Sequence, residues 1–304
     1  YKRQSPHASG AFSIVIRDLD GNDTPDLVAA NSTSLGVHFY LNNRSGAFFY
    51  KESVFFDKAT FHAAVGDVDD DGDADVIISF PGSNVIAVVF NDGTASFDRA
   101  DEYPVGSTPR ATVVVDLDND GDLDIYWVNG AYLEAPTAGS GNALYLNNGS
   151  ASFTDVAARA GVEGHGWGMG ALSGDVDNDG DADLYVTCLQ ENILYRNDGE
   201  ANFTEITAIA GIEAPRWSTG AAFADFDLDG DIDLYVAHYA AFDQDEITPL
   251  GAQWKGENIF IGPLGLLPDP ALLYRNNGDG TFTLSETRKC GVKPTIGVSH
   301  DFPL

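Results

Sequence analysis

A nine-residue aspartate-rich segment recurs five times along the chain, and each copy runs directly into an apolar stretch. The segment reads D-x-[DN]-x-[DN]-G-x-x-D, and its copies span residues 18–26, 67–75, 116–124, 175–183 and 225–233. Successive copies begin 49, 49, 59 and 50 residues apart. A period of this length indicates that one structural unit is repeated, so the chain must fold as an array of similar units.

A second block follows each aspartate-rich segment. It is clearest as NILYRNDGEANFTEITAIAGI, which combines a strand-like run, an N-D-G turn and a second short run. Its copies begin at Val37, Ile86, Asn142, Asn192 and Ala271. A sixth unit opens at Gly297–Phe302. Because the two blocks recur in the same order, residues 1–304 are predicted to form one repeat domain.

The units have the composition of short strands. Runs such as AFSIVIRD, LYVTC and FTEI are rich in Val, Ile, Tyr and Phe, and N-D-G or N-N-G turns separate them. Four short strands in each unit predict an all-β fold, namely a β-propeller of four-stranded blades with five complete repeats and the start of a sixth. A β-solenoid is the alternative, although its repeat is usually shorter. Only AARAGV and its equivalents are expected to form a helical turn.

The aspartate-rich segments place oxygen ligands at alternate positions of a tight loop. A glycine at position six permits the sharp turn, and a backbone carbonyl at position seven completes the shell of side chains. Such a shell suits calcium, whereas magnesium keeps more of its waters and zinc prefers His or Cys. We therefore expect four or five Ca²⁺ ions. The predicted ligands are Asp18, Asp20, Asn22, Asp26, Asp67, Asp69, Asp71, Asp75, Asp116, Asp118, Asp120, Asp124, Asp175, Asp177, Asp179, Asp183, Asp225, Asp227, Asp229 and Asp233.

Two other kinds of loop share part of this pattern. An EF-hand begins with the same spacing, but it needs a glutamate at position twelve and a helix on each side. Position twelve holds Ala29, Ile78, Trp127, Val186 and Val236. Both flanks are strand-like, so an EF-hand is excluded. A solvated acidic turn is the second alternative, but five matched copies would gather mutually repelling carboxylates without a cation.

The first copy departs from the pattern. It has Asn22 at position five, Asp23 where glycine is expected, and Pro25 at position eight. Asn22 also begins an N-x-[ST] sequence for glycosylation. We expect this site to be the weakest of the five, or empty.

The charge of the chain limits its partners. There are 47 Asp and Glu against 16 Lys and Arg, which gives a formal net charge of −31. Such a surface repels nucleic acids and anionic membranes. The sequence also lacks an apolar run of roughly 18 residues, so membrane insertion is not predicted.

The expected location is extracellular or at the cell surface. The chain opens with the polar stretch YKRQSPHASG, which fits a cytosolic protein or a mature secreted one. Five glycosylation sequences favour the secretory route, at Asn22, Asn31, Asn43, Asn148 and Asn202.

Two cysteines are too few for a disulfide scaffold. In the repeat alignment Cys290 replaces the small residue Ala160, and Cys188 ends the strand-like run LYVTC, directly after the residue that aligns with Ala237. We expect two free, buried thiols rather than one bridge.

The order of the two blocks resembles a known family. GAAFADFDLDGDIDLYVAHY paired with NILYRNDGEANFTEITAIAGI is similar to the FG-GAP/VCBS repeat, more narrowly to the propeller part of ASPIC/UnbV-type proteins and distantly to the integrin α-subunit propeller. The resemblance covers nearly the whole chain. It implies blades around a central axis, calcium in the loop between the first two strands of each blade, and adhesion, matrix or surface roles. Such propellers commonly have seven blades, more than the repeats counted here.

Two features outside the loops are candidate contact surfaces. Trp167 and Trp217 each stand eight residues before a leading aspartate, where they either pack between blades or offer a stacking platform. The fifth unit carries an insertion at residues 239–270 that is rich in apolar residues, and it either caps the propeller or contacts a partner.

Three functions are compatible with these features. The favoured one is an extracellular adhesion or scaffold module that contacts protein partners or assembles with itself. A calcium-dependent lectin is the second, and a polysaccharide lyase is the third. No catalytic residues are predicted, because the six histidines occupy unrelated repeat positions and no nucleophile motif is present. The protein is therefore expected not to be an enzyme.

Overall fold

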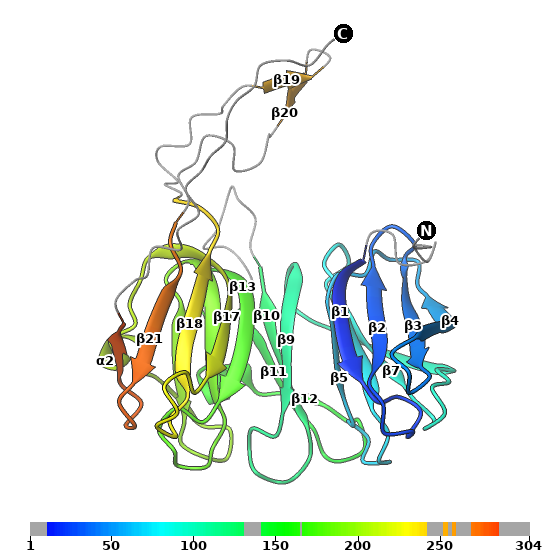
Figure 1. Ribbon diagram of the computed structural model, residues 1–304, viewed down its shortest axis with the longest axis horizontal. Coiled ribbons are helices and arrows are strands. Elements are labelled where there is room, and N and C mark those ends of the chain that lie inside the picture. The colour runs from blue at the N-terminus through cyan, green and yellow to red at the C-terminus, as the bar shows by residue number, and fades with distance from the viewer. Residues whose placement is uncertain are drawn as a thin grey trace.

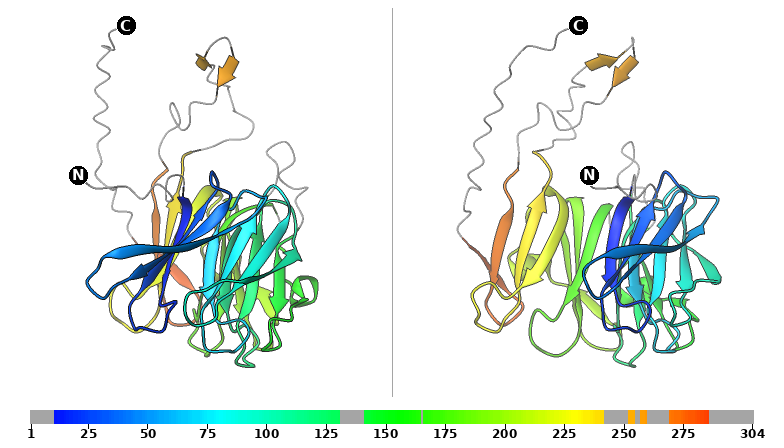
Figure 2. Two further views of the ribbon diagram at one scale, coloured as in Figure 1. Left: turned by 90° about the vertical axis from the view of Figure 1, so that its right-hand side faces the viewer. Right: turned by 45° about the vertical axis from the view of Figure 1, so that its right-hand side comes forward.

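The computed structural model describes residues 11–130, 141–164, 166–241, 252–254, 257–259 and 269–285. Five repeat units in this part of the chain each contribute four antiparallel strands, and each set of four is called a blade below. Blades 1, 2 and 3 are separate four-stranded sheets, whereas blades 4 and 5 join in one eight-stranded sheet. Figures 1 and 2 show the blades side by side in an arc, with blades 1 and 5 at its ends. The predicted all-β, propeller-like architecture is thus confirmed.

The strands follow the repeat along the chain. Blade 1 contains β1 (Ala11–Arg17), β2 (Asp26–Asn31), β3 (Gly36–Asn42) and β4 (Phe48–Phe55). Blade 2 contains β5 (Ala63–Gly66), β6 (Asp75–Phe80), β7 (Val85–Phe90) and β8 (Arg99–Pro104). Blade 3 contains β9 (Pro109–Val115), β10 (Asp124–Asn129), β11 (Ala143–Leu146) and β12 (Thr154–Asp155).

Blades 4 and 5 repeat the same order. Blade 4 contains β13 (Trp167–Gly174), β14 (Asp183–Gln190), β15 (Ile193–Asn197) and β16 (Phe203–Glu205). Blade 5 contains β17 (Arg216–Ala224), β18 (Asp233–His238), β21 (Leu272–Asn276) and β22 (Phe282–Leu284). The hairpin of β19 (Ala252–Trp254) and β20 (Glu257–Ile259) lies within the predicted insertion. The helical turns α1 (Ala157–Ala160) and α2 (Thr207–Ala210) form where AARAGV and its equivalent were expected to turn.

Each aspartate-rich segment connects the first and second strands of a blade. The aspartate at position nine opens the second strand and pairs with the last residue of the first, as Asp124 pairs with Val115 and Asp183 with Gly174. Because strands flank the loops on both sides, the structure agrees with the exclusion of an EF-hand. The loops lie together along one edge of the arc, the lower edge in Figure 1.

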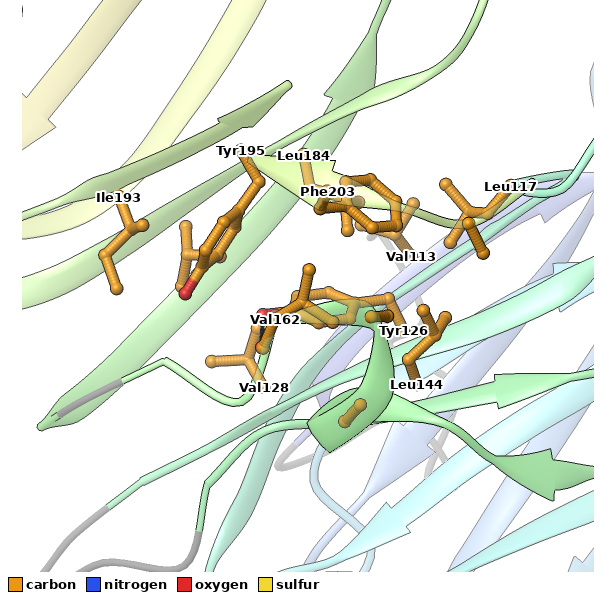
Figure 3. Packing of buried hydrophobic residues seen from close by; sticks show 14 of the residues in the cluster. Val113, Leu117, Tyr126, Val128, Leu144, Val162, Leu184, Ile193, Tyr195 and Phe203 are labelled. Atoms are coloured by element: carbon orange, nitrogen blue, oxygen red, sulfur yellow. Dashed lines mark hydrogen bonds between the residues drawn. The ribbon is translucent and has the colours of Figure 1, made fainter. Parts of the chain in front are cut away.

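The hydrophobic core lies between neighbouring blades. Strand β14 is buried on both faces over Asp183–Leu189, which explains why LYVTC is apolar without alternation. Between blades 3 and 4, side chains from the two sheets face each other (Figure 3). They include Val113, Leu117 and Tyr126 from blade 3, and Leu184, Tyr195 and Phe203 from blade 4. A blade therefore depends on its neighbours for burial of its apolar faces.

The two end blades expose positions that inner blades bury. Tyr185 is 0% exposed between blades 4 and 5, whereas Tyr235 at the same repeat position of blade 5 is 41% exposed. Val176 is 0% exposed and its equivalent Phe226 is 49% exposed. At the other end, Ile14 of β1 is 63% exposed. The exposed side chains follow directly from the absence of a described neighbour blade on these faces.

This difference gives a matched pair of substitutions. We expect Tyr185→Ala to lower the free energy of unfolding by about 3–5 kcal/mol, because it empties a closed space between two blades. Tyr235→Ala removes the same atoms from a partly solvated face, and we expect a loss of about 1 kcal/mol or less. Chemical denaturation followed by circular dichroism measures both. Equal losses would contradict the placement of the core between blades.

Several features expected from the sequence can be placed only in part. Cys188 is free and buried, as expected, and burial raises the pKa of its thiol to about 12. Cys290, the sixth-unit sequence at 297–302 and most of the insertion lie outside the described residues. No helix in the described ranges is long and apolar enough to cross a membrane.

Candidate functional site

All five aspartate loops adopt the same turn. In four loops the glycine at position six has a positive φ, such as 94° at Gly72, and its N–H donates to the first aspartate, with Gly72 N to Asp67 Oδ2 at 2.9 Å. In the first loop Asp23 takes this place with a φ of 62°, and its N–H lies 2.6 Å from Asp18 Oδ2. The first loop therefore forms its turn without glycine, while its weaker metal binding stays a prediction.

The loops bring carboxylates together as the spacing predicted. In every loop three carboxylate oxygens from three aspartates lie within 4.8 Å of one another. The groups are Asp18, Asp20 and Asp26; Asp67, Asp69 and Asp71; Asp116, Asp118 and Asp124; Asp175, Asp177 and Asp183; and Asp225, Asp227 and Asp229. Positions one and three belong to all five groups, and the third member is position five or nine.

The inner oxygens of these groups fit a metal ion. Five of them are buried without a hydrogen-bond partner: Asp20 Oδ1, Asp67 Oδ1, Asp69 Oδ1, Asp116 Oδ1 and Asp177 Oδ1. Burial, followed by the neighbouring carboxylates, raises the pKa of Asp69, Asp118 and Asp177. A buried, unpaired anion beside other anions is costly unless a cation lies among them. The loops could therefore hold metal ions through these oxygens.

The aspartate at position nine also has a structural role. In blade 4, Asp183 is fully buried and accepts the N–H of Val176 at 2.7 Å and of Asn197 at 2.8 Å. The equivalent pairs recur in the other four blades. Burial raises the pKa of Asp75, Asp124 and Asp183 to about 7. Without any ion, these carboxylates already tie the loop to the end of the third strand of the same blade.

In blades 2 to 5, an asparagine at the end of the third strand forms a hydrogen bond to the preceding blade. Asn197 Nδ2 donates to the carbonyl of Leu117 in blade 3 at 2.9 Å and to Ala182 in its own blade at 3.2 Å. Asn91, Asn147 and Asn276 make the same two bonds. The sequence analysis did not predict this contact. An Asn recurs at the end of the third strand in all five blades, and that recurrence could have indicated its role.

Removal of this asparagine gives a second matched pair. Asn197→Ala leaves the Ala182 carbonyl without this donor and breaks a bond between blades, so we expect a loss of about 1–3 kcal/mol in unfolding free energy. Asn42 occupies the same position in blade 1, where its Nδ2 reaches only Pro25 O of its own blade. We expect Asn42→Ala to cost about 1 kcal/mol or less. Urea denaturation of both variants is the measurement, and a reversed order would exclude the asparagine contact as a contributor to blade packing.

Neighbouring loops also contact each other through positions four and seven. Asn119 Nδ2 donates to Asp181 Oδ1 at 2.5 Å, and Asn178 Nδ2 donates to Asp231 Oδ1 at 2.7 Å. The aspartate at position seven lies against the N-x-G turn of its own blade. A Cβ on Gly149, whose φ is 73°, would lie 2.8 Å from Asp122 Oδ2. The loops of blades 3, 4 and 5 are thus joined by direct hydrogen bonds along one acidic edge.

Aromatic side chains gather at the opposite edge of blades 4 and 5. Trp167 and Trp217 both flank Leu189 through strand pairing, and their ring centroids are 6.4 Å apart. Tyr239 lies 5.0 Å from Trp217, and the Arg110 guanidinium lies 5.5 Å from the Trp167 ring. Both tryptophans are partly exposed. The structure therefore joins the two predicted tryptophans to Arg110 and Tyr239, which the sequence did not single out.

The repeat sequence matches a known family profile. Four stretches, residues 18–78, 67–127, 132–186 and 188–236, match the profile of the FG-GAP-like repeat, and together they make up more than half of the chain. The chain belongs to the FG-GAP-like repeat family. No curated protein matches this FG-GAP-like chain.

Solved structures show different degrees of similarity to this FG-GAP-like chain. One is an Agrocybe aegerita lectin that recognises non-reducing terminal N-acetylglucosamine, with 18% identity over 89% of this chain and 64% of the lectin, and a TM-score of 0.53. Another is the V. cholerae biofilm matrix protein Bap1, with 16% identity over 75% of this chain and 35% of Bap1, and a TM-score of 0.43. The chain thus spans less than two thirds of either protein. At 18% identity the likeness to the lectin concerns the fold alone.

Proposed function

We propose that this FG-GAP-like chain is a calcium-stabilised propeller module for adhesion or assembly outside the cell. The observation that carries the proposal is the set of five carboxylate groups, four of which contain at least one buried oxygen without a hydrogen-bond partner. Calcium takes six to eight hard oxygen ligands in flexible geometry, which suits loops that offer several carboxylates and a backbone carbonyl. The ligands would be the positions one, three, five and nine named above.

A binding role is more consistent with these loops than catalysis. When calcium is bound it supplies positive charge that neutralises the carboxylates, and it makes the loops rigid. Bound carboxylates of this kind are poor general acids. The loops also touch each other and the preceding blade, so ions at this edge would stabilise the arrangement of blades that presents the opposite edge to a partner.

Bead adhesion tests the proposed role. Beads coated with the chain are mixed with one another and with a cell-derived extracellular matrix, and attachment is counted in calcium, after chelation and after calcium is restored. We expect attachment only in calcium, with recovery on restoration. Beads that carry Asp69→Asn, Asp118→Asn and Asp177→Asn together serve as the loop control and should attach weakly. Attachment that persists in chelator, or never occurs in calcium, contradicts the proposal.

A calcium-dependent lectin is the second candidate. It is supported by the partly exposed row of Trp167, Trp217 and Tyr239, because tryptophan and tyrosine combine a flat apolar face with a polar tip and suit sugar rings. The shared fold with a lectin that binds N-acetylglucosamine is consistent with this candidate. Binding of the chain to a glycan array in calcium, and its loss in Trp167→Ala, would support it over the first.

A further inference from the structure

The edge opposite the aspartate loops carries a group of hydrogen-bond donors without acceptors. Arg110 Nε, Thr108 Oγ1 and Trp167 Nε1 are all buried and have no hydrogen-bond partner. The first two lie close together, because a Cβ on Gly130 would be 2.7 Å from Arg110 Nε and 2.6 Å from Thr108 Oγ1. Trp167 lies under the same guanidinium. Three buried donors at one place favour a ligand rich in acceptor oxygens.

Arg110 stands out in so acidic a chain. None of the ion pairs formed by the described residues includes it. The nearby Arg216, by contrast, is paired with Asp269. Burial lowers the pKa of Arg110, and no carboxylate of the described chain offsets that loss of solvation. A half-buried guanidinium is costly without an anion, and it is well shaped to bind a carboxylate through two parallel hydrogen bonds.

The backbone beneath Arg110 is held in an unusual conformation. Thr108 has a φ of 51°, which is unfavourable for a β-branched residue. Its N–H donates to Asn84 Oδ1 at 3.1 Å, and its carbonyl accepts the N–H of Gly130 at 3.0 Å. Such strain persists where the surroundings fix it, and it is often found at ligand sites. Here it positions the Thr108 hydroxyl beside Arg110.

A row of aromatic side chains begins at Trp167, beside Arg110. Trp167, Trp217 and Tyr239 follow one another at centroid distances of 6.4 and 5.0 Å across blades 4 and 5. Tyr239 is 39% exposed, and its N–H is bonded to the carbonyl of Trp217 at 2.9 Å. A row of flat faces suits successive rings of a chain-like ligand, because the C–H face of a sugar packs on the electron-rich face of an aromatic ring.

We propose that Arg110, Thr108, Trp167, Trp217 and Tyr239 form a binding site for a carboxylate-bearing oligosaccharide. The carboxylate of one sugar binds the partly exposed Arg110 guanidinium, which lies beside Thr108, and neighbouring rings pack along the aromatic row. An acidic peptide shares the carboxylate, but the aromatic row favours sugar rings over side chains. This inference rests on the lectin candidate. It adds that the site selects negatively charged sugars.

Calorimetry with oligogalacturonate and its carboxyl-reduced counterpart tests the site. In calcium we expect the acidic sugar to bind at least about tenfold more tightly than the reduced one, since a hydrogen bond to a charged group changes the affinity by about this factor. Arg110→Gln should remove the preference, and Tyr239→Ala should weaken both sugars. Phe49→Ala alters an aromatic residue that is 56% exposed on β4, far along the chain from the site, and should leave binding unchanged. Each variant is first checked for the same calcium-dependent melting curve as the parent chain.

Three outcomes of these binding tests would overturn the inference. Equal binding of both sugars in the parent and in Arg110→Gln overturns the carboxylate inference and leaves the lectin candidate standing. Absence of binding to either sugar overturns this inference, and an empty glycan array would remove the lectin candidate as well. Arg110-dependent binding of a polyglutamate peptide without sugar binding assigns the site to acidic protein and also overturns the inference. Bead adhesion in calcium is independent of all three, so failure here and failure of the adhesion proposal are distinguishable.

Discussion

Excess calcium is expected to raise the unfolding temperature of the chain on the order of 20 °C above its value in chelator. One site at a free concentration of about 100 times Kd stabilises the folded state by about 2.7 kcal/mol, and four or five sites act together. For a chain of this size, each kcal/mol shifts the melting temperature by about 2 °C. The physical cause is the removal of repulsion among carboxylates such as Asp67, Asp69 and Asp71.

The measurement combines differential scanning calorimetry with a count of bound metal. We expect four or five calcium ions per chain, depending on the first loop. Magnesium at the same concentration is the control, and we expect a much smaller shift because that ion gives up its waters reluctantly. An unchanged melting temperature and no bound metal would mean that the loops are acidic turns, and the central proposal would be wrong.

The first loop is expected to bind calcium more weakly than the other four loops. Its turn is intact, but position five is Asn22 and the Arg44 guanidinium donates to the Asn22 carbonyl. A neutral ligand and a neighbouring cation both reduce calcium affinity. The site expected to fill last during a titration is therefore the first loop, and Arg44→Ala should increase its affinity.

The part of the structure that the sequence predicted well is local. The loop turn depends on alternate aspartates and a residue that accepts positive φ, both within nine positions, so the spacing alone predicted the carboxylate groups. The strands were predicted because runs such as NILYR are rich in strand-forming residues and end at N-D-G or N-N-G turns. The repeat itself, and the family to which it belongs, followed from the order of two short blocks.

Contacts between blades could not be predicted in the same way. Asn197 bonds to Leu117, which lies 80 residues earlier, and nothing in the sequence near Asn197 indicates which blade precedes it. The neighbours of Trp167 were equally hidden, since Arg110 enters from another blade through its long side chain. Burial at the ends was also hidden, because Tyr185 and Tyr235 stand in nearly identical sequences and differ only in having a neighbour.

Replacement of the aspartate at position nine is expected to be the most damaging single change in a loop. Asp183→Ala removes the acceptor for the N–H groups of Val176 and Asn197, both in buried surroundings. Each buried donor without an acceptor costs about 1–3 kcal/mol, so we expect a loss of about 3–5 kcal/mol even in chelator. In calcium the loss should be larger by the contribution of the ion bound at this loop.

Asp179→Ala is the control that separates the two roles of these aspartates. Asp179 stands at position five of the same loop, is exposed, and accepts only the N–H of Asp181 at 2.9 Å. In chelator we expect its removal to be neutral within about 1 kcal/mol, because a lost hydrogen bond is offset by less repulsion among carboxylates. In calcium we expect a clear loss. In chelator, urea denaturation should therefore show a large loss of unfolding free energy for Asp183→Ala and almost none for Asp179→Ala. The additional loss that appears in calcium should be similar for the two variants. If Asp183→Ala were harmless in chelator, its bonds to Val176 and Asn197 would contribute nothing to folding, and position nine would serve the ion alone.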